Sequence, residues 1–96
     1  MKIEERINNG DRAREVLENE AFAQAFADLK EEITQQWQHS PSRDTEGREK
    51  LWLMLSLSNK LELILKSSLE TGTLAKLELE HQRTLAQRAK AFLGQS

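Results

Sequence analysis

The chain has no cysteine and only a single proline among its 96 residues. The absence of cysteine excludes disulfide frameworks, zinc–thiolate sites and thiol nucleophiles, and it is compatible with a reducing compartment. The segment Met1–Arg6 lacks the apolar core of a signal peptide, so a cytoplasmic location is the default expectation. No apolar run can span a membrane, because Asn59, Lys60 and Glu62 interrupt the most hydrophobic stretch.

Aromatic residues are also scarce, at 5% of the sequence. No stretch pairs aromatic with basic side chains in the way that proteins stack nucleic-acid bases. The glycines are isolated and form no phosphate-binding loop. The serines stand in no motif that would pair them with a histidine and an acid. We therefore predict a non-enzymatic protein with no catalytic residues, no metal site and no cofactor.

Large apolar side chains are dense in one stretch, residues 51–69. On a helix, their positions cover about half of the circumference or more. A surface helix needs an apolar stripe only somewhat wider than about 100°. We therefore expect this helix to have two neighbours and part of its arc to contact a partner subunit, most of all around Trp52 and Leu63. The complete predicted interface is Trp52, Leu53, Leu57, Leu63 and Ile64.

The spacing of apolar residues elsewhere predicts an all-α fold in one domain, residues 1–96. The expected helices are about 11–38, 44–71 and 74–93, arranged as an antiparallel helical hairpin plus a third helix, and self-association would complete the bundle. Asp11 is the expected N-cap of the first helix. Residues 1–10 are expected to be a flexible segment, because Asn8-Asn9-Gly10 is a turn signal.

Two breaks separate the expected helices. The first is His39-Ser40-Pro41-Ser42, where proline disfavours helical geometry; Asp44 or Ser42 would cap the next helix. Trp37 and Trp52 flank this turn and could meet across it. The second is Thr71-Gly72-Thr73, where glycine suits the end of one helix and Thr73 can cap the next. The alternative is one continuous rod through Gly72.

The charged residues are compatible with two more specific functions, metal binding and phosphate binding. Glu78-x-x-His81 has the spacing of di-iron carboxylate bundles, although a single copy makes a partly buried histidine at a helix seam the favoured interpretation. The net charge is −2, yet no acid follows His81. That basic end fits the dipole of a C-terminal helix. In the alternative reading, phosphate contacts would come from Arg43, Arg48, Arg83, Arg88 and Lys90.

Residues 43–52, Arg-Asp-Thr-Glu-Gly-Arg-Glu-Lys-Leu-Trp, resemble part of a group of small, mostly uncharacterised proteins of tailed phages and prophages. Trp37 to Pro41 before them and Leu69 to Ala75 after them extend the resemblance. It implies a protein of the phage head and packaging gene region, located in the bacterial host cytoplasm or the virion. It carries over no catalytic residues.

These observations together predict an accessory or assembly protein that acts through homo-oligomerisation and protein–protein binding. Its partners would be copies of itself and phage head or packaging proteins, with no membrane contact. The alternative function is a DNA-binding packaging factor similar to small terminase subunits, which are also short, helical and ring-forming.

Overall fold

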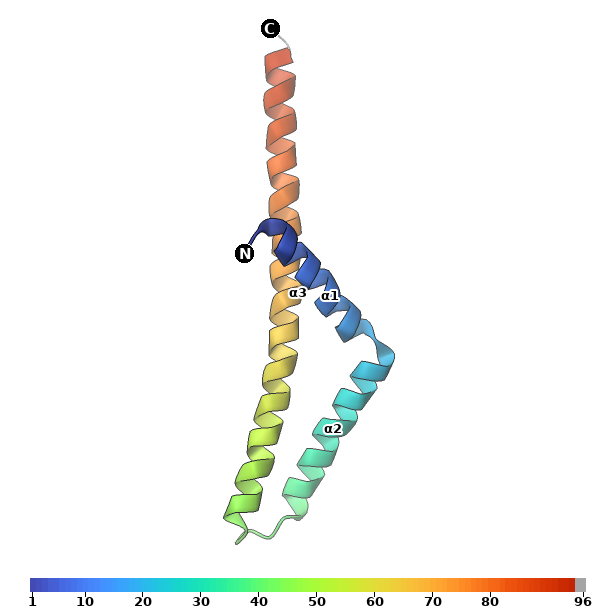
Figure 1. The fold of residues 1–96 in the computed structure, drawn as a ribbon, viewed down its shortest axis with the longest axis vertical. Helices are drawn as coiled ribbons and strands as arrows, with labels where there is room; N and C mark the ends of the chain where they lie inside the picture. Colours follow the sequence, from blue (N-terminus) through green and yellow to red (C-terminus); the bar gives the residue numbers. More distant parts are fainter. Residues whose placement is uncertain (95–96) are drawn as a thin grey trace.

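The computed structural model describes residues 1–94, and these residues form three helices without any strand. Helix α1 spans Ile3–Glu18, α2 spans Glu20–His39 and α3 spans Thr45–Gly94. Figure 1 shows α2 running alongside the first half of α3 as an antiparallel hairpin, while α1 crosses α3 higher up. The all-α fold and the arrangement of a hairpin plus a third helix are confirmed, although the third helix is the amino-terminal one.

The molecule is a rod rather than a globule. Its principal extents are 81 × 25 × 16 Å and its radius of gyration is 21.9 Å. A compact chain of this length would have a radius of gyration of about 12.5 Å. The difference arises because the carboxyl-terminal part of α3 extends beyond both other helices (Figure 1). No described helix combines the length and hydrophobicity needed to cross a membrane.

Helix α3 is continuous over 50 residues, so the predicted break at Gly72 is wrong and the alternative of one rod is correct. Gly72 does not adopt the left-handed conformation of a helix terminus. Thr73 does not cap a new helix, since its hydroxyl donates to the Leu69 carbonyl 3.0 Å away, within the same helix. Leu69 and Leu74 flank this site with strong helix propensity, and a single glycine costs only about 1 kcal/mol.

The expected flexible segment is also wrong, because Asn8-Asn9-Gly10 lies inside α1. Asp11 is therefore an interior residue of α1 rather than an N-cap, and its carboxylate pairs with Lys76 of α3 at 2.6 Å. The expected helix 11–38 is instead divided at Asn19. The Asn19 side chain accepts a hydrogen bond from the Phe22 amide at 2.9 Å and so caps α2.

Gly10 and Gly72 explain why α1 packs so closely on α3. A Cβ atom built on Gly72 would lie 2.8 Å from the Gly10 Cα atom, and one built on Gly10 would lie 2.7 Å from the Gly72 Cα atom. The two backbones therefore touch where the helices cross. Ala13 and Ala75, each three residues further on, are buried beside this contact. Small residues at this spacing permit close helix crossings, whatever their local turn propensity.

The turn between α2 and α3 follows the prediction. Helix α2 ends at His39 and α3 begins at Thr45. Asp44 caps α3, since its carboxylate accepts a hydrogen bond from the Gly47 amide at 3.1 Å. A side chain at Gly47 would meet that carboxylate, which would have to shift from its present position. Glu46 and Lys50 form an ion pair at 3.5 Å in the first turns of α3, whereas Arg48 turns away from Asp44 towards the end of α2.

The seam between α2 and α3 is only partly closed. Leu51, Leu55 and Leu65 of α3 line grooves together with α2 residues, and all three are half-buried. On α2, Ile33 is buried, and the Phe22 and Phe26 rings stack with their centroids 5.6 Å apart. In the described chain, Ala13, Ile33 and Ala75 are the only fully buried apolar residues. A core this small leaves most of the apolar surface of the helices uncovered.

Candidate interaction surface

The exposed surface is too large for a compact protein of this size. The accessible area is 7848 Å². A folded monomer of 11.1 kDa is expected to expose about 5,700 Å², so the excess is about 2,100 Å². Stable protein–protein interfaces bury about 800 Å² on each partner. The excess could therefore supply more than one interface of ordinary size.

Nine of the twelve large apolar residues that are exposed on the described part of α3 form two stripes on different sides of the rod. We define the front stripe as Leu53, Met54, Leu57, Leu61 and Ile64, and the back stripe as Trp52, Leu63, Leu74 and Leu85. All nine residues have exposed fractions between 47% and 66%. At about 100° per residue, Leu63 is rotated by about 120° from Leu57. The two stripes therefore cannot contact the same surface of a partner.

The five interface residues predicted from the sequence are all exposed, but the structure does not bring them together. Leu53, Leu57 and Ile64 belong to the front stripe. Trp52 and Leu63 belong to the back stripe. Their role in binding stays a prediction, now divided between two surfaces.

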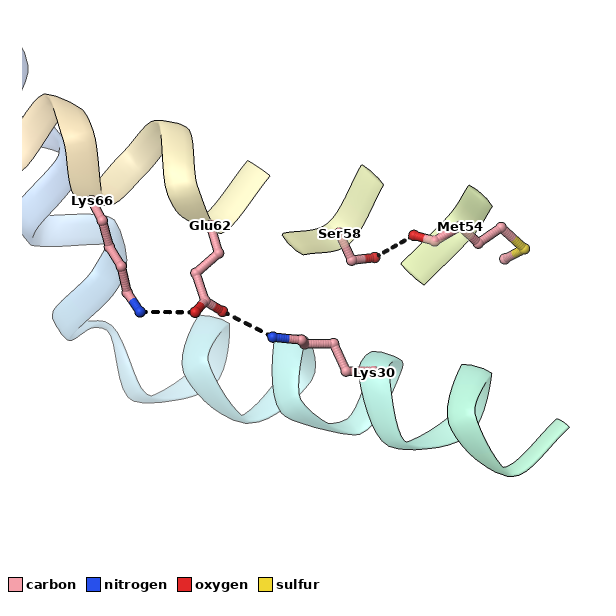
Figure 2. A network of polar contacts seen from close by, with 5 residues as sticks. All are labelled: Lys30, Met54, Ser58, Glu62 and Lys66. Atoms are coloured by element: carbon pink, nitrogen blue, oxygen red, sulfur yellow. Dashed lines mark hydrogen bonds and ion pairs between the residues drawn. The ribbon is translucent and has the colours of Figure 1, made fainter. Parts of the chain in front are cut away.

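The front stripe borders a groove of about 430 Å³ between α2 and α3. Its lining is entirely uncharged: Phe22, Ala25, Phe26, Leu29, Leu57, Ser58 and Leu61. The Ser58 hydroxyl donates to the Met54 carbonyl at 2.9 Å, so its hydrogen bond is satisfied within α3 (Figure 2). A partner could cover this groove without burying a charge, which would otherwise cost several kcal/mol.

A second groove of about 320 Å³ lies near the turn and contains both tryptophans. Trp37 from α2 and Trp52 from α3 line it together with Ile33, Leu51 and Leu55, so the two indoles do lie near one another across the hairpin. Trp37 carries a further contact on its ring, where the Arg48 guanidinium lies 4.1 Å from the centroid. Such a cation–π contact fixes the position of the ring at the edge of the groove.

The third groove, of about 300 Å³, is the charged one. Figure 2 shows Lys30 of α2 and Lys66 of α3 reaching the same Glu62 carboxylate, at 3.3 Å and 2.9 Å. The hydrogen bonds from Lys66 and then Lys30 hold the pKa of the Glu62 carboxyl below its ordinary value of 4.5. The Lys30–Glu62 pair ties the two arms of the hairpin together, beside the apolar residues Phe22, Phe26 and Leu65 of the same groove.

The residues proposed for phosphate contacts do not form one patch. Arg43 lies in the turn between α2 and α3, whereas Arg83, Arg88 and Lys90 lie on the last turns of α3, at the opposite end of the rod (Figure 1). On that last segment Arg88 is rotated by about 140° from Arg83. The Arg48 guanidinium donates to the Trp37 and Ser40 carbonyls at 3.2 and 3.3 Å, and so caps the end of α2.

The Glu78-x-x-His81 pair is placed on the exposed part of α3. Glu78 faces α1, where its carboxylate lies 3.6 Å from the Arg6 guanidinium. His81 is exposed, so the expectation of a partly buried position is wrong. Among residues 1–94, no three histidine, cysteine or acidic side chains gather where they could hold a metal ion.

Sequence reasoning missed the regularity of the back stripe. Trp52, Leu63, Leu74 and Leu85 follow one another at intervals of 11 residues. Eleven residues make three turns and advance the direction by only about 20°, so the four side chains form a nearly straight line along the rod. The signal was present in the sequence, but it becomes visible only when residues 45–94 are treated as one helix.

No protein-family model, curated protein or solved structure matches this chain significantly.

Proposed function

We propose that this chain is a non-enzymatic accessory protein that acts in assembly, by binding copies of itself and a protein partner. The observation that carries the proposal is the surface: about 2,100 Å² more than a compact monomer exposes, with only three fully buried apolar residues in the described part. A chain that buries so little apolar area on its own gains most of its stability from association.

Two separate apolar surfaces support two kinds of contact. The front stripe borders an uncharged groove that α2 and α3 line together, as the arms of a hairpin do in a helical bundle. The back stripe begins at Trp52, in the groove between α2 and α3 near the turn, and continues into the part of the rod that no other helix covers. One surface can bind another copy while the other holds a different protein.

The biological setting that we propose is the head or packaging region of a tailed phage or prophage, in the host cytoplasm or the virion. Its support is the resemblance carried by residues 43–52 and their flanking segments. Mass spectrometry of purified virions from a host that encodes the chain would test this setting, through the presence of its peptides.

Sedimentation velocity of the full chain at micromolar concentration tests the proposed function. We expect a species of at least twice the monomer mass of 11.1 kDa. The oligomer should gain helical content and thermal stability as the concentration rises, because association and folding are coupled by mass action. A stable, fully helical monomer at all concentrations would contradict the proposal.

A further inference from the structure

We propose that two copies pack against one another through the front groove, which is the groove of about 430 Å³ that the front stripe borders. The two hairpins stack in opposite directions, so that the carboxyl-terminal ends of α3 project from opposite ends of the dimer. This inference rests on the proposed function, which requires only that copies associate. It specifies which surface they use and in which orientation.

The occupant follows from the shape and chemistry of the groove. Helix α2 and the facing part of α3 form a pair of antiparallel helices with a shared apolar face. Such a pair is half of a four-helix bundle, and a second identical pair completes it through a two-fold, isologous interface. The lining of the front groove carries no charge, whereas the groove of about 300 Å³ includes Lys30, Glu62 and Lys66 in its lining. The front groove can therefore be dehydrated without burying ions, and it lies between both arms of the hairpin.

The orientation follows from the position of α1. Ala75 comes 18 residues, or five full helical turns, after Leu57, so both point to the same side of the rod. Ala75 is 1% exposed where α1 crosses α3. Helix α1 therefore lies on the front side of α3, directly above the open groove.

Stacking in the same direction would bring two α1 helices into one space. Each α1 would lie on the inner side of its own α3 at the same height, between the two layers of the bundle. The layers of a bundle are separated by only about 8–10 Å, which leaves no room for two further helices. The same-direction dimer is therefore blocked just above the groove.

Stacking in opposite directions avoids this collision. With the two-fold axis at Leu57, the start of the partner's α3 at Thr45 lies about 18 Å from the axis along the rod, and Gly72 lies about 22 Å from it. The turn between α2 and α3 of each copy then lies next to α1 of the other copy, on the side of α1 that faces the groove. Contact between the turn of one copy and α1 of the other would therefore limit how far the two hairpins slide along one another, and so set the register of the bundle.

A matched pair of substitutions tests the surface. Leu57 and Leu63 are both leucines of α3 with the same exposed fraction, 66%. We expect Leu57→Glu to raise the dimer dissociation constant at least about a hundredfold, because it appears twice in a two-fold interface. We expect Leu63→Glu to leave the dissociation constant within about threefold of the wild-type value. A dimer that resists Leu57→Glu, or that Leu63→Glu disperses, would overturn the assignment of the surface.

Distances between spin labels in the unmutated interface test the orientation. The chain has no cysteine, so Gln82→Cys and Asn59→Cys each give a single labelling site. Pulsed dipolar spectroscopy should find the two Gln82 labels about 75 Å apart in the opposed dimer, against about 20–30 Å if both copies run in the same direction. The Asn59 labels lie at nearly the height of the axis but on the outer side of α3, so their separation should be similar in either dimer. A short Gln82 distance would refute the orientation and leave self-association intact. A purely monomeric sedimentation profile would refute the proposed function as well.

Discussion

Replacing Gly72 with alanine tests whether the backbone contact between α1 and α3 holds the molecule together. The added Cβ atom would lie 2.8 Å from the Gly10 Cα atom and 3.0 Å from the Arg6 carbonyl oxygen. Carbon atoms in favourable contact are about 3.5–4.0 Å apart, so α1 must retreat by about 1 Å. Both obstructing atoms belong to the backbone of α1, so no side-chain rotation can relieve the overlap.

The magnitude follows from two opposing terms. Overpacking a close contact costs about 1–3 kcal/mol, whereas alanine gains about 1 kcal/mol over glycine in a helix interior. We expect a net loss of about 1 kcal/mol in the free energy of unfolding. Without the contact, the same substitution would stabilise the helix by about 1 kcal/mol, so the two possibilities differ by about 2 kcal/mol.

Urea denaturation at a fixed protein concentration, followed by circular dichroism, measures this difference. Thr71→Ala is the control, because Thr71 is exposed on the same turn and alanine there should only gain helix propensity, about 0.5 kcal/mol. The double variant Gly10→Ala/Gly72→Ala should cost less than the sum of the single variants, since α1 is already displaced by the first substitution. Hydrogen exchange should accelerate in α1 and not in α2. A stabilised Gly72→Ala with unchanged exchange in α1 would refute the reasoning.

Substitutions at three further residues probe the hairpin. Arg48→Ala should lower the free energy of unfolding by about 1–2 kcal/mol, because it removes the hydrogen bonds that cap the carboxyl-terminal end of α2. It should also change Trp37 fluorescence, because it removes the cation above the indole. Arg48→Lys should not restore both the stability and the fluorescence. Asn19→Ala should cost about 1 kcal/mol in urea denaturation by removing the cap of α2. The lowered pKa of Glu62 implies a stabilisation that is present above pH 4.5 and is lost as the pH falls through the pKa of the folded state. The difference in melting temperature between the wild type and Glu62→Gln should therefore shrink from pH 6 to pH 3. A constant difference would contradict this.

Local sequence signals were sufficient wherever neighbouring residues alone decide the structure. The turn at residues 40–44 could be predicted from Pro41, and the cap at Asp44 from its position before the helix. The helical class followed from apolar spacing, since burial at intervals of three and four residues is compatible only with helices. The exposure of Leu57 and Leu63 could be anticipated because the apolar arc was too wide for the available neighbours.

Two glycines show what the sequence alone could not decide. Gly10 and Gly72 are turn or helix-end signals when each is considered with its neighbours, and both lie within helices. Their role depends on each other, across 62 positions, because each lacks the atom that would keep the other helix away. Only the tertiary structure contains that pairing, and it fixes α1 on the front of α3.

The sequence by itself determined that the chain is helical, that it turns at Pro41 and that residues 51–69 carry more apolar surface than one neighbour can cover, because these properties depend on local propensity and spacing. The tertiary structure decided that α3 is one rod, that its apolar residues separate into two stripes and that α1 closes the space above one of them. The physical reason is that a glycine pair stabilises a helix crossing only through contact, and contact between distant segments is set by the whole fold.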